Sequence, residues 1–327
     1  MHEAKTDPAA DTTNATDTTD MTEDVLVIGG GAGGLNAALV LARARRRVLV
    51  ADAGRPRNAP AREMHGFVSR DGTPPADLLA AGRAEVERYG GRFVAGEVSA
   101  VRRDGRGFAA EVDGRTVRAR RVIVATGLRD ELPGVPGLRE RWARDVLHCP
   151  YCHGWEVRDR PLGVLGAPGR QAQAVHQALL VRQWSDDVTF VVSATAGALD
   201  DASRRRLAAR GIRIVEGDVT GLRVEGDELR GLRLADGTGV PLSALFVSPR
   251  PVPHDALLAG LGCERDAGGR VRVDPAGLTS VPGVWAVGNV VDFGAHVVVA
   301  AAAGAKAALA VNTDLIEEDI EEDIERA

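Results

Sequence analysis

The feature that most constrains the fold is a run of glycines between an apolar segment and an alanine-rich segment near the N-terminus. Residues 24–28 predict a buried strand, residues 35–44 predict a helix, and residues 47–51 predict a second strand that ends at Asp52. The glycines between the first strand and the helix have the spacing G-x-G-x-x-G and are Gly29, Gly31 and Gly34. Glycines at this spacing permit a tight turn and a close backbone approach to a pyrophosphate, which the free N–H groups of a helix N-terminus bind. Because Asp52 stands where an acid accepts ribose hydroxyls, the segment predicts a dinucleotide-binding unit.

Two later segments predict the rest of the same domain. Residues 121–127, RVIVATG, predict a buried strand that ends in a turn, and residues 283–292, GVWAVGNVVD, predict a short strand followed by a polar turn. Their separation implies an inserted domain at about 128–247, which has its own strand, turn and helix pattern at 161–181 and a strand at 188–193. We therefore expect an α/β fold of two Rossmann-like domains, with the second inserted in the first.

The ends of the chain differ in composition from this body. Residues 1–20 are rich in Thr, Asp and Ala and predict a disordered tail, because they hold too little apolar surface to offset chain entropy. Residues 314–327 are acidic, with isoleucine at every fourth position, Ile316, Ile320 and Ile324. That pattern fits either an apolar stripe on an extension of the last helix or a frayed, solvated tail, and we expect the tail. The split dinucleotide domain then comprises 21–127 and 248–313.

Charge and hydropathy exclude several classes of partner. The net charge is −5, but the acidic ends leave the body at about +8, and almost all of its basic residues are arginine. An arginine bias of this kind indicates a GC-rich coding sequence, and we expect no nucleic-acid partner. The N-terminus lacks the apolar core of a secretory signal, and the alanine-rich run at 296–311 is shorter than the roughly 18 to 20 apolar residues of a membrane span. We expect a cytoplasmic protein with no membrane contact, and a buried helix at this run.

The cysteines point to redox chemistry. There are three of them, too few for a disulfide scaffold, and Cys149 and Cys152 form a C-x-x-C pair within the string HCPYCHGWE. A zinc site of this spacing needs a second pair, whereas Cys263 is remote and alone. We therefore expect a reactive thiol pair and no metal, with Cys263 as an inert buried thiol.

Over residues 22–313 these motifs resemble the low-molecular-weight thioredoxin reductase family, which implies FAD as the cofactor and a homodimer formed through the flavin domains. Carried over by position, the glycines and Asp52 would hold the adenosine half of FAD, and Thr126 and Gly127 would form the turn that crosses beneath it. Asn289 stands where the family usually has an Asp that holds the ribityl chain. The helix beginning near His296 would lie beneath the pyrimidine edge of the flavin, and Asn58 lies in a loop expected on the cofactor side.

His153 directly follows the C-x-x-C pair, where ordinary thioredoxin reductases have an Asp. This C-x-x-C-H pattern resembles the dithiol oxidases of the gliotoxin and holomycin pathways, which close a disulfide within a small metabolite. An imidazole accepts a thiol proton at neutral pH better than an ionised Asp does, so we expect His153 to be the catalytic base. His148 and His296 are the rival bases, and a surface histidine without a role is the alternative.

The second nucleotide site departs from the reductase pattern. In the loop expected after the strand near residue 165, Pro168 replaces the glycine that lets the backbone approach a pyrophosphate. Residues 192–197, VSATAG, lack the basic cluster that binds the 2′-phosphate of NADPH. Arg204, Arg205 and Arg206 come later, on what we expect to be a solvated helix face. The inserted domain is therefore interpreted as a degenerate nicotinamide site.

These patterns together predict an FAD-dependent dithiol oxidase. The resemblance to the holomycin-pathway oxidases, together with the GC-rich coding bias, implies a small dithiol of the dithiolopyrrolone type as substrate. The order of the pair in these relatives implies that the dithiol attacks the disulfide at Cys149 and that Cys152 passes electrons to the flavin. Dioxygen would accept them as hydrogen peroxide, and a protein acceptor is the alternative. An NADPH-dependent thioredoxin reductase is the alternative enzyme. A flavoprotein redox sensor, in which the disulfide reports thiol status without turnover, is the alternative outside enzymes.

Overall fold

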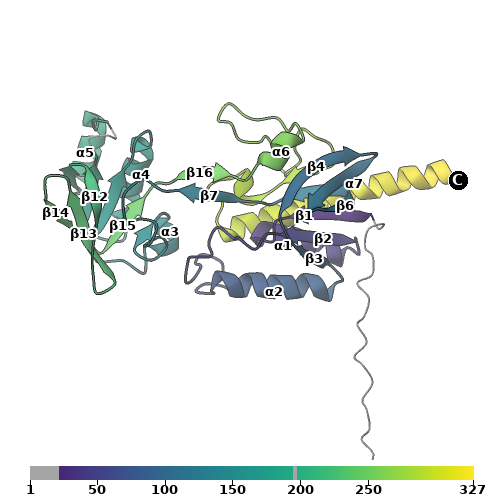
Figure 1. Cartoon of the computed structure of the whole chain (residues 1–327), viewed down its shortest axis with the longest axis horizontal. Helices are drawn as coiled ribbons and strands as arrows, with labels where there is room; N and C mark the ends of the chain where they lie inside the picture. Colours follow the sequence, from purple (N-terminus) through teal and green to yellow (C-terminus); the bar gives the residue numbers. More distant parts are fainter. Residues whose placement is uncertain (1–21, 194–196) are drawn as a thin grey trace, which may run out of the picture.

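The structure is a computed structural model, and it describes residues 22–193 and 197–327. Figure 1 shows two lobes joined by a narrow two-stranded ribbon. The ribbon pairs β7 (Leu128–Glu131) antiparallel with β16 (Arg250–Pro253), so the chain crosses between the lobes at these two strands. The disordered tail expected at residues 1–20 lies outside the described residues.

The first lobe is built on a seven-stranded sheet of order β3-β2-β1-β6-β5-β4, with β17 paired to β6. Its strands are β1 (Glu23–Ile28), β2 (Val48–Asp52), β3 (Arg92–Ala95), β4 (Val98–Asp104), β5 (Gly107–Val112), β6 (Arg115–Val124) and β17 (Val284–Ala286). The pairings of β1 with β2 and β6, of β2 with β3 and of β17 with β6 are parallel, whereas β4, β5 and β6 pair antiparallel. Every residue of β1 is buried, as expected for a central strand covered on both faces.

Helices cover one face of this sheet. α1 (Ala32–Arg43) packs between α2 (Pro75–Arg88) and α7 (Val297–Arg326), and the side chains of Val25 and Val27 point toward this layer. The alternate residues Leu26 and Ile28 point to the opposite face, where they pack with the β4–β5 hairpin and α6 (Ala256–Gly260). Because β1 ends at Ile28, the glycine-rich turn between β1 and α1 lies at the carboxyl ends of the parallel strands.

The second lobe has a five-stranded parallel sheet of order β11-β10-β9-β15-β8. Its parallel strands are β8 (Val146–Leu147), β9 (Leu162–Gly166), β10 (Val188–Val192), β11 (Arg213–Glu216) and β15 (Ala244–Val247). A three-stranded antiparallel sheet joins them, formed by β12 (Val219–Glu225), β13 (Glu228–Leu234) and β14 (Gly239–Pro241). Its helices are α3 (Pro150–His153), α4 (Gln171–Val181) and α5 (Asp201–Ala209). The two Rossmann-like units expected from the sequence are both present.

The prediction of a frayed acidic tail at 314–327 is wrong. Helix α7 continues without a break to Arg326, and Figure 1 shows its last turns running beyond the sheet. Glu318 lies 2.9 Å from both Arg120 and Arg121 of β6, and its side chain is only 13% exposed. Ion pairs to β6 thus hold the acidic turns in place, because an acidic residue recurs on the side of the helix that faces these arginines. The isoleucine stripe is not buried, since Ile324 is 71% exposed.

Among the described helices, α7 is long and apolar enough to cross a membrane by length and composition, which corrects the expectation that the run is too short. Only one face of α7 is buried, against α1, whereas Val299 and Leu309 are 47% and 63% exposed, so the expectation of a buried helix holds for one face alone. Gly304 of α7 sits so close to α1 that a Cβ there would lie 1.9 Å from the carbonyl oxygen of Gly33. Asn36 of α1 also donates from Nδ2 to the carbonyl of Ala301 at 2.9 Å.

Candidate active site

The glycine-rich turn is shaped by three different backbone requirements. Gly29 has a φ of +105°, and a Cβ there would lie 2.5 Å from the carbonyl oxygen of Ala125. A Cβ on Gly34 would lie 1.9 Å from the carbonyl oxygen of Gly29, so this glycine lets helix and strand pack closely. A Cβ on Gly31 would meet no atom within 4 Å, because this residue faces an open cavity at the N-terminus of α1.

The acid at the end of β2 is held beside this turn. A Cβ on Gly30 would lie 2.7 Å from the carboxylate of Asp52 and would displace it, so Gly30 also shapes the site, although the motif spacing did not single it out. The carboxylate of Asp52 lies 3.6 Å from Arg83 and faces the same cavity. An open glycine cradle, uncapped helix N–H groups and a carboxylate at the strand end fit the adenosine and pyrophosphate parts of FAD.

A cavity of about 340 Å³ connects the glycine-rich turn with the cysteine pair across the two lobes. Of the site residues predicted from the sequence, Gly34 alone is absent from its lining, because its place is in the packing between β1 and α1. The predicted residues that line the cavity are Gly29, Gly31, Asp52, Asn58, Thr126, Gly127, Cys149, Cys152, His153, Asn289 and His296. The structure therefore brings the nucleotide-binding turn and the thiol pair into one space.

Arg57 organises the middle of the cavity, and motif spacing gave it no role beyond a place in a cofactor-side loop. Its guanidinium donates two hydrogen bonds of 2.7 Å to the carboxylate of Asp130, in the connecting strand β7. It also donates to Oδ1 of Asn289 at 3.2 Å, while Nδ2 of Asn289 donates to the carbonyls of Asp292 and Ala295. Asn289 is thus fixed on its loop, and this set of contacts joins residues too distant in sequence for a local pattern to reveal.

Thr126 is held in a comparable way, since its hydroxyl donates to the carbonyl of His254 at 2.7 Å. Gly127 next to it has a φ of +68°, which favours glycine at the crossing turn.

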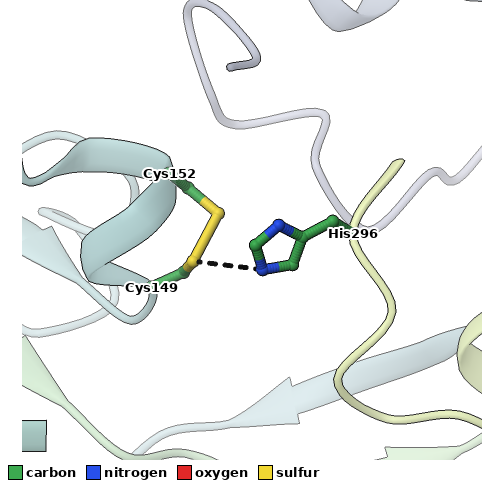
Figure 2. Close-up of side chains that lie close together, drawn as sticks. All are labelled: Cys149, Cys152 and His296. Carbon is green, nitrogen blue, oxygen red and sulfur yellow. Dashed lines mark hydrogen bonds between the residues drawn. A yellow bond between two sulfur atoms is a disulfide. The ribbon is translucent and has the colours of Figure 1, made fainter. Parts of the chain in front are cut away.

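The cysteine pair forms a disulfide at the start of α3. Cys149 is the residue before the helix, and the Cα atoms of Cys149 and Cys152 are 5.2 Å apart. Figure 2 shows the imidazole of His296, from the other lobe, pointing at the sulfur of Cys149, with 3.8 Å between Nε2 and Sγ. The two sulfurs and this nitrogen lie within 4.8 Å of one another, but the closed disulfide uses both sulfurs, so the arrangement favours thiol exchange over metal binding.

Two further histidines flank the disulfide. Burial lowers the pKa of His148, whose Nδ1 lies 3.2 Å from the carbonyl oxygen of Val247. Gln177 of α4, a buried residue that motif reasoning missed, donates to the carbonyls of His148 and Val247 at 2.6 and 3.1 Å and so fixes the segment that leads into Cys149. Burial also lowers the pKa of His153, against an opposing effect of Glu156. Burial thus favours the neutral imidazole of His153, which lines the cavity without a hydrogen bond to either sulfur among the described residues.

The remaining cysteine has no contact with this site. Cys263 is 7% exposed and its Sγ lies 3.5 Å from the hydroxyl of Thr279. Burial raises the pKa of its thiol, so little thiolate forms there, as expected of an inert position.

In the second lobe, the loop from β9 to α4 stands where a nicotinamide nucleotide would bind. Pro168 is exposed at its tip, and Gly169 follows with a φ of +69°. Of the segment 192–197 expected to lack a basic cluster, residues 194–196 lie outside the described residues. Arg204 on α5 pairs with Glu216 rather than standing free.

Comparison with known proteins agrees with this architecture. The family model of the pyridine nucleotide-disulphide oxidoreductases matches residues 23–305. The chain belongs to this family. Thioredoxin reductase sirT of Leptosphaeria maculans is 32% identical over 91% of this chain and 95% of its own length, and thioredoxin reductase tcpT of Claviceps purpurea is 33% identical over 81% and 86%. The crystal structure of HlmI superposes with a TM-score of 0.90 at 56% identity, covering 94% of this chain and 96% of that one.

The resemblance to thioredoxin reductase-like flavoproteins, on the branch that includes tcpT, sirT and HlmI, is thereby confirmed, as is the α/β fold of two Rossmann-type units. The chain is an oxidoreductase of a flavin-dependent family, and its Cys149–Cys152 disulfide lies in the cavity that holds the dinucleotide-binding turn.

Proposed function

We propose that this protein is an FAD-dependent dithiol oxidase that closes a disulfide within a small dithiol metabolite of the dithiolopyrrolone type. Dioxygen is the electron acceptor in this proposal, and hydrogen peroxide is the second product. The observation that carries it is that the disulfide opens into the flavin cavity, whereas the nucleotide loop of the second lobe presents Pro168 instead of a backbone N–H. Electrons would then enter through thiols and not through NADPH.

In this proposal the two cysteines have different roles. A thiolate of the substrate attacks Sγ of Cys149, which breaks the Cys149–Cys152 bond and leaves the electron pair on Cys152. The second substrate thiolate attacks the substrate sulfur of the mixed disulfide, so the product disulfide forms and Cys149 leaves as a thiolate. FAD, when bound by the glycine turn, Asp52 and the Thr126 and Asn289 loops, supplies a two-electron acceptor for the reduced pair.

A thioredoxin-disulfide reductase that uses NADPH is the second candidate. Two observations favour it: the relatives sirT and tcpT carry the name thioredoxin reductase, and Gly169 keeps a left-handed turn before α4. The absence of a backbone donor at Pro168 opposes it.

Location and assembly are part of the proposal. We place the protein in the cytoplasm, in keeping with its thioredoxin reductase-like family, and we expect a homodimer formed through the flavin lobes.

Anaerobic stopped-flow spectroscopy of the FAD-loaded protein tests this proposal. A small dithiol should bleach the flavin, whereas NADPH and NADH should not, and in air the dithiol should produce one hydrogen peroxide for each dioxygen consumed. Cys149→Ser is the matched control that should abolish bleaching by the dithiol. Bleaching of the flavin by NADPH within milliseconds would show that the protein is a reductase. If the dithiol bleaches the flavin but dioxygen does not reoxidise it, the proposal of dioxygen as electron acceptor is refuted.

A further inference from the structure

His296, at the start of α7, contacts the cysteine pair, which its expected place beneath the flavin does not explain. His296 precedes the first turn of α7, and its side chain is exposed. The loop before it is tied down by Asn289, whose Nδ2 donates to the carbonyl of Ala295 at 3.0 Å. The ring of Tyr151, which stands between the two cysteines in the sequence, lies 6.3 Å from the His296 ring. The imidazole is therefore held between the two lobes with Nε2 facing Cys149 (Figure 2).

Neither of the other flanking histidines has this geometry. His148 is half-buried with Nδ1 turned to the carbonyl of Val247, and His153 is half-buried without a hydrogen bond to a sulfur in the described part of the chain. A group that exchanges protons with a reacting thiol must lie within reach of its sulfur. Of the three histidines, His296 is the one with a nitrogen in contact with a sulfur of the pair among the described residues.

We propose that His296 is the acid–base residue for Cys149. The inference rests on the proposed dithiol chemistry and adds to it by naming the residue that transfers protons, His296, apart from the cysteine that passes electrons, Cys152.

Protons and electrons balance in two steps. In the first, Nε2 takes the proton of one substrate thiol, that sulfur bonds to Cys149, and the electron pair of the broken disulfide stays on Cys152 as a thiolate. In the second, the other substrate thiol loses its proton to water and bonds to the first substrate sulfur. The Cys149 sulfur leaves with its electron pair and receives the proton that His296 holds. The substrate loses two electrons and two protons, and the enzyme holds a Cys149 thiol and a Cys152 thiolate.

Other charged groups around the disulfide also influence its pH behaviour. The carboxylate of Asp292, in the loop before His296, accepts from the backbone N–H of Gly294. The groups that face the flanking histidines are His65 and Glu156 beside His153, and Asp130, Arg57 and Arg170 around His148. The test therefore compares variants that differ only at a histidine.

Alkylation of Cys149 measures the proposed pair directly, without substrate or acceptor. In a Cys152→Ser background, Cys149 stands free beside His296, and the rate of its reaction with iodoacetamide is followed by peptide mass spectrometry from pH 5 to 10. An imidazolium at this distance should place the midpoint of the profile about one to two units below the ~8.5 of an ordinary thiol. His296→Asn should return it toward 8.5 and slow alkylation at pH 7 by about 10-fold or more. Asn is a good residue at a helix N-cap, so this variant preserves the start of α7.

The matched control is His176→Ala, an exposed histidine on α4, which should leave the profile unchanged. Identical profiles with and without His296 would overturn the proposal, and so would a loss of the low midpoint in His153→Ala instead. These outcomes do not depend on which dithiol or acceptor the enzyme uses. A failed oxidase assay with an intact alkylation result would refute the proposed function alone.

Discussion

Replacing Gly304 by Ala tests whether the contact between α7 and α1 positions the nucleotide-binding turn. The added Cβ would lie 1.9 Å from the carbonyl oxygen of Gly33, whereas an ordinary carbon–oxygen contact needs about 3.3 Å. The helices must therefore separate by roughly 1.4 Å, because both atoms belong to rigid backbone rather than to a flexible side chain. Overpacking of this kind costs about 2 to 3 kcal/mol, and it moves α1 together with Gly31 at its N-terminus.

Two assays measure this change. The Gly304→Ala variant should unfold several degrees below the wild type, and the ratio of bound flavin to protein should fall after purification. Gly260→Ala is the control, since Gly260 is exposed at the end of α6 and its Cβ would meet no atom within 4 Å. That variant should stay within about 1 kcal/mol of the wild type. A Gly304→Ala protein with wild-type flavin content and an unchanged melting temperature would refute the role assigned to this contact.

Three further predictions concern the helix end, the sulfurs and acid stability. Glu318→Gln should lower the free energy of unfolding, measured by urea titration, by about 2 kcal/mol, because it leaves two partly buried arginines of β6 short of a partner. Glu321 is exposed, so Glu321→Gln should change the free energy of unfolding by less than about 0.5 kcal/mol. The FAD-loaded Cys149→Ser variant should show long-wavelength charge-transfer absorbance from a Cys152 thiolate, and appearance of that band in Cys152→Ser instead would reverse the assignment. Burial holds the pKa of His148 below its ordinary 6.5, so the unfolded chain binds the extra proton and the free energy of unfolding falls as the pH drops below about 6.5. His148→Gln should therefore flatten the decline in urea midpoint between pH 7 and pH 5. A decline as steep as that of the wild type would contradict this origin.

Local sequence patterns were sufficient for the features that depend on a few neighbouring residues. The first strand, the glycine-rich turn and α1 follow from apolar periodicity and from conformations that glycine alone adopts easily, so their place in the fold could be predicted. The C-x-x-C spacing brings the two sulfurs within reach of each other through a single helical turn. The continuation of α7 as a helix beyond residue 313 could not be predicted this way, because ion pairs with β6, about 200 residues away in the chain, hold these turns in place.

The sequence by itself therefore determined the two Rossmann-type units, the dinucleotide-binding turn and the redox pair. The tertiary structure decided which imidazole contacts the pair. His153 is adjacent to Cys152 in sequence and was the expected base, yet His296, 147 positions from Cys149, is the histidine whose nitrogen faces its sulfur. The reason is physical: a residue next to a helical cysteine is carried to another side of the helix by its rotation, whereas the ribbon of β7 and β16 sets the second lobe against the loop that precedes α7.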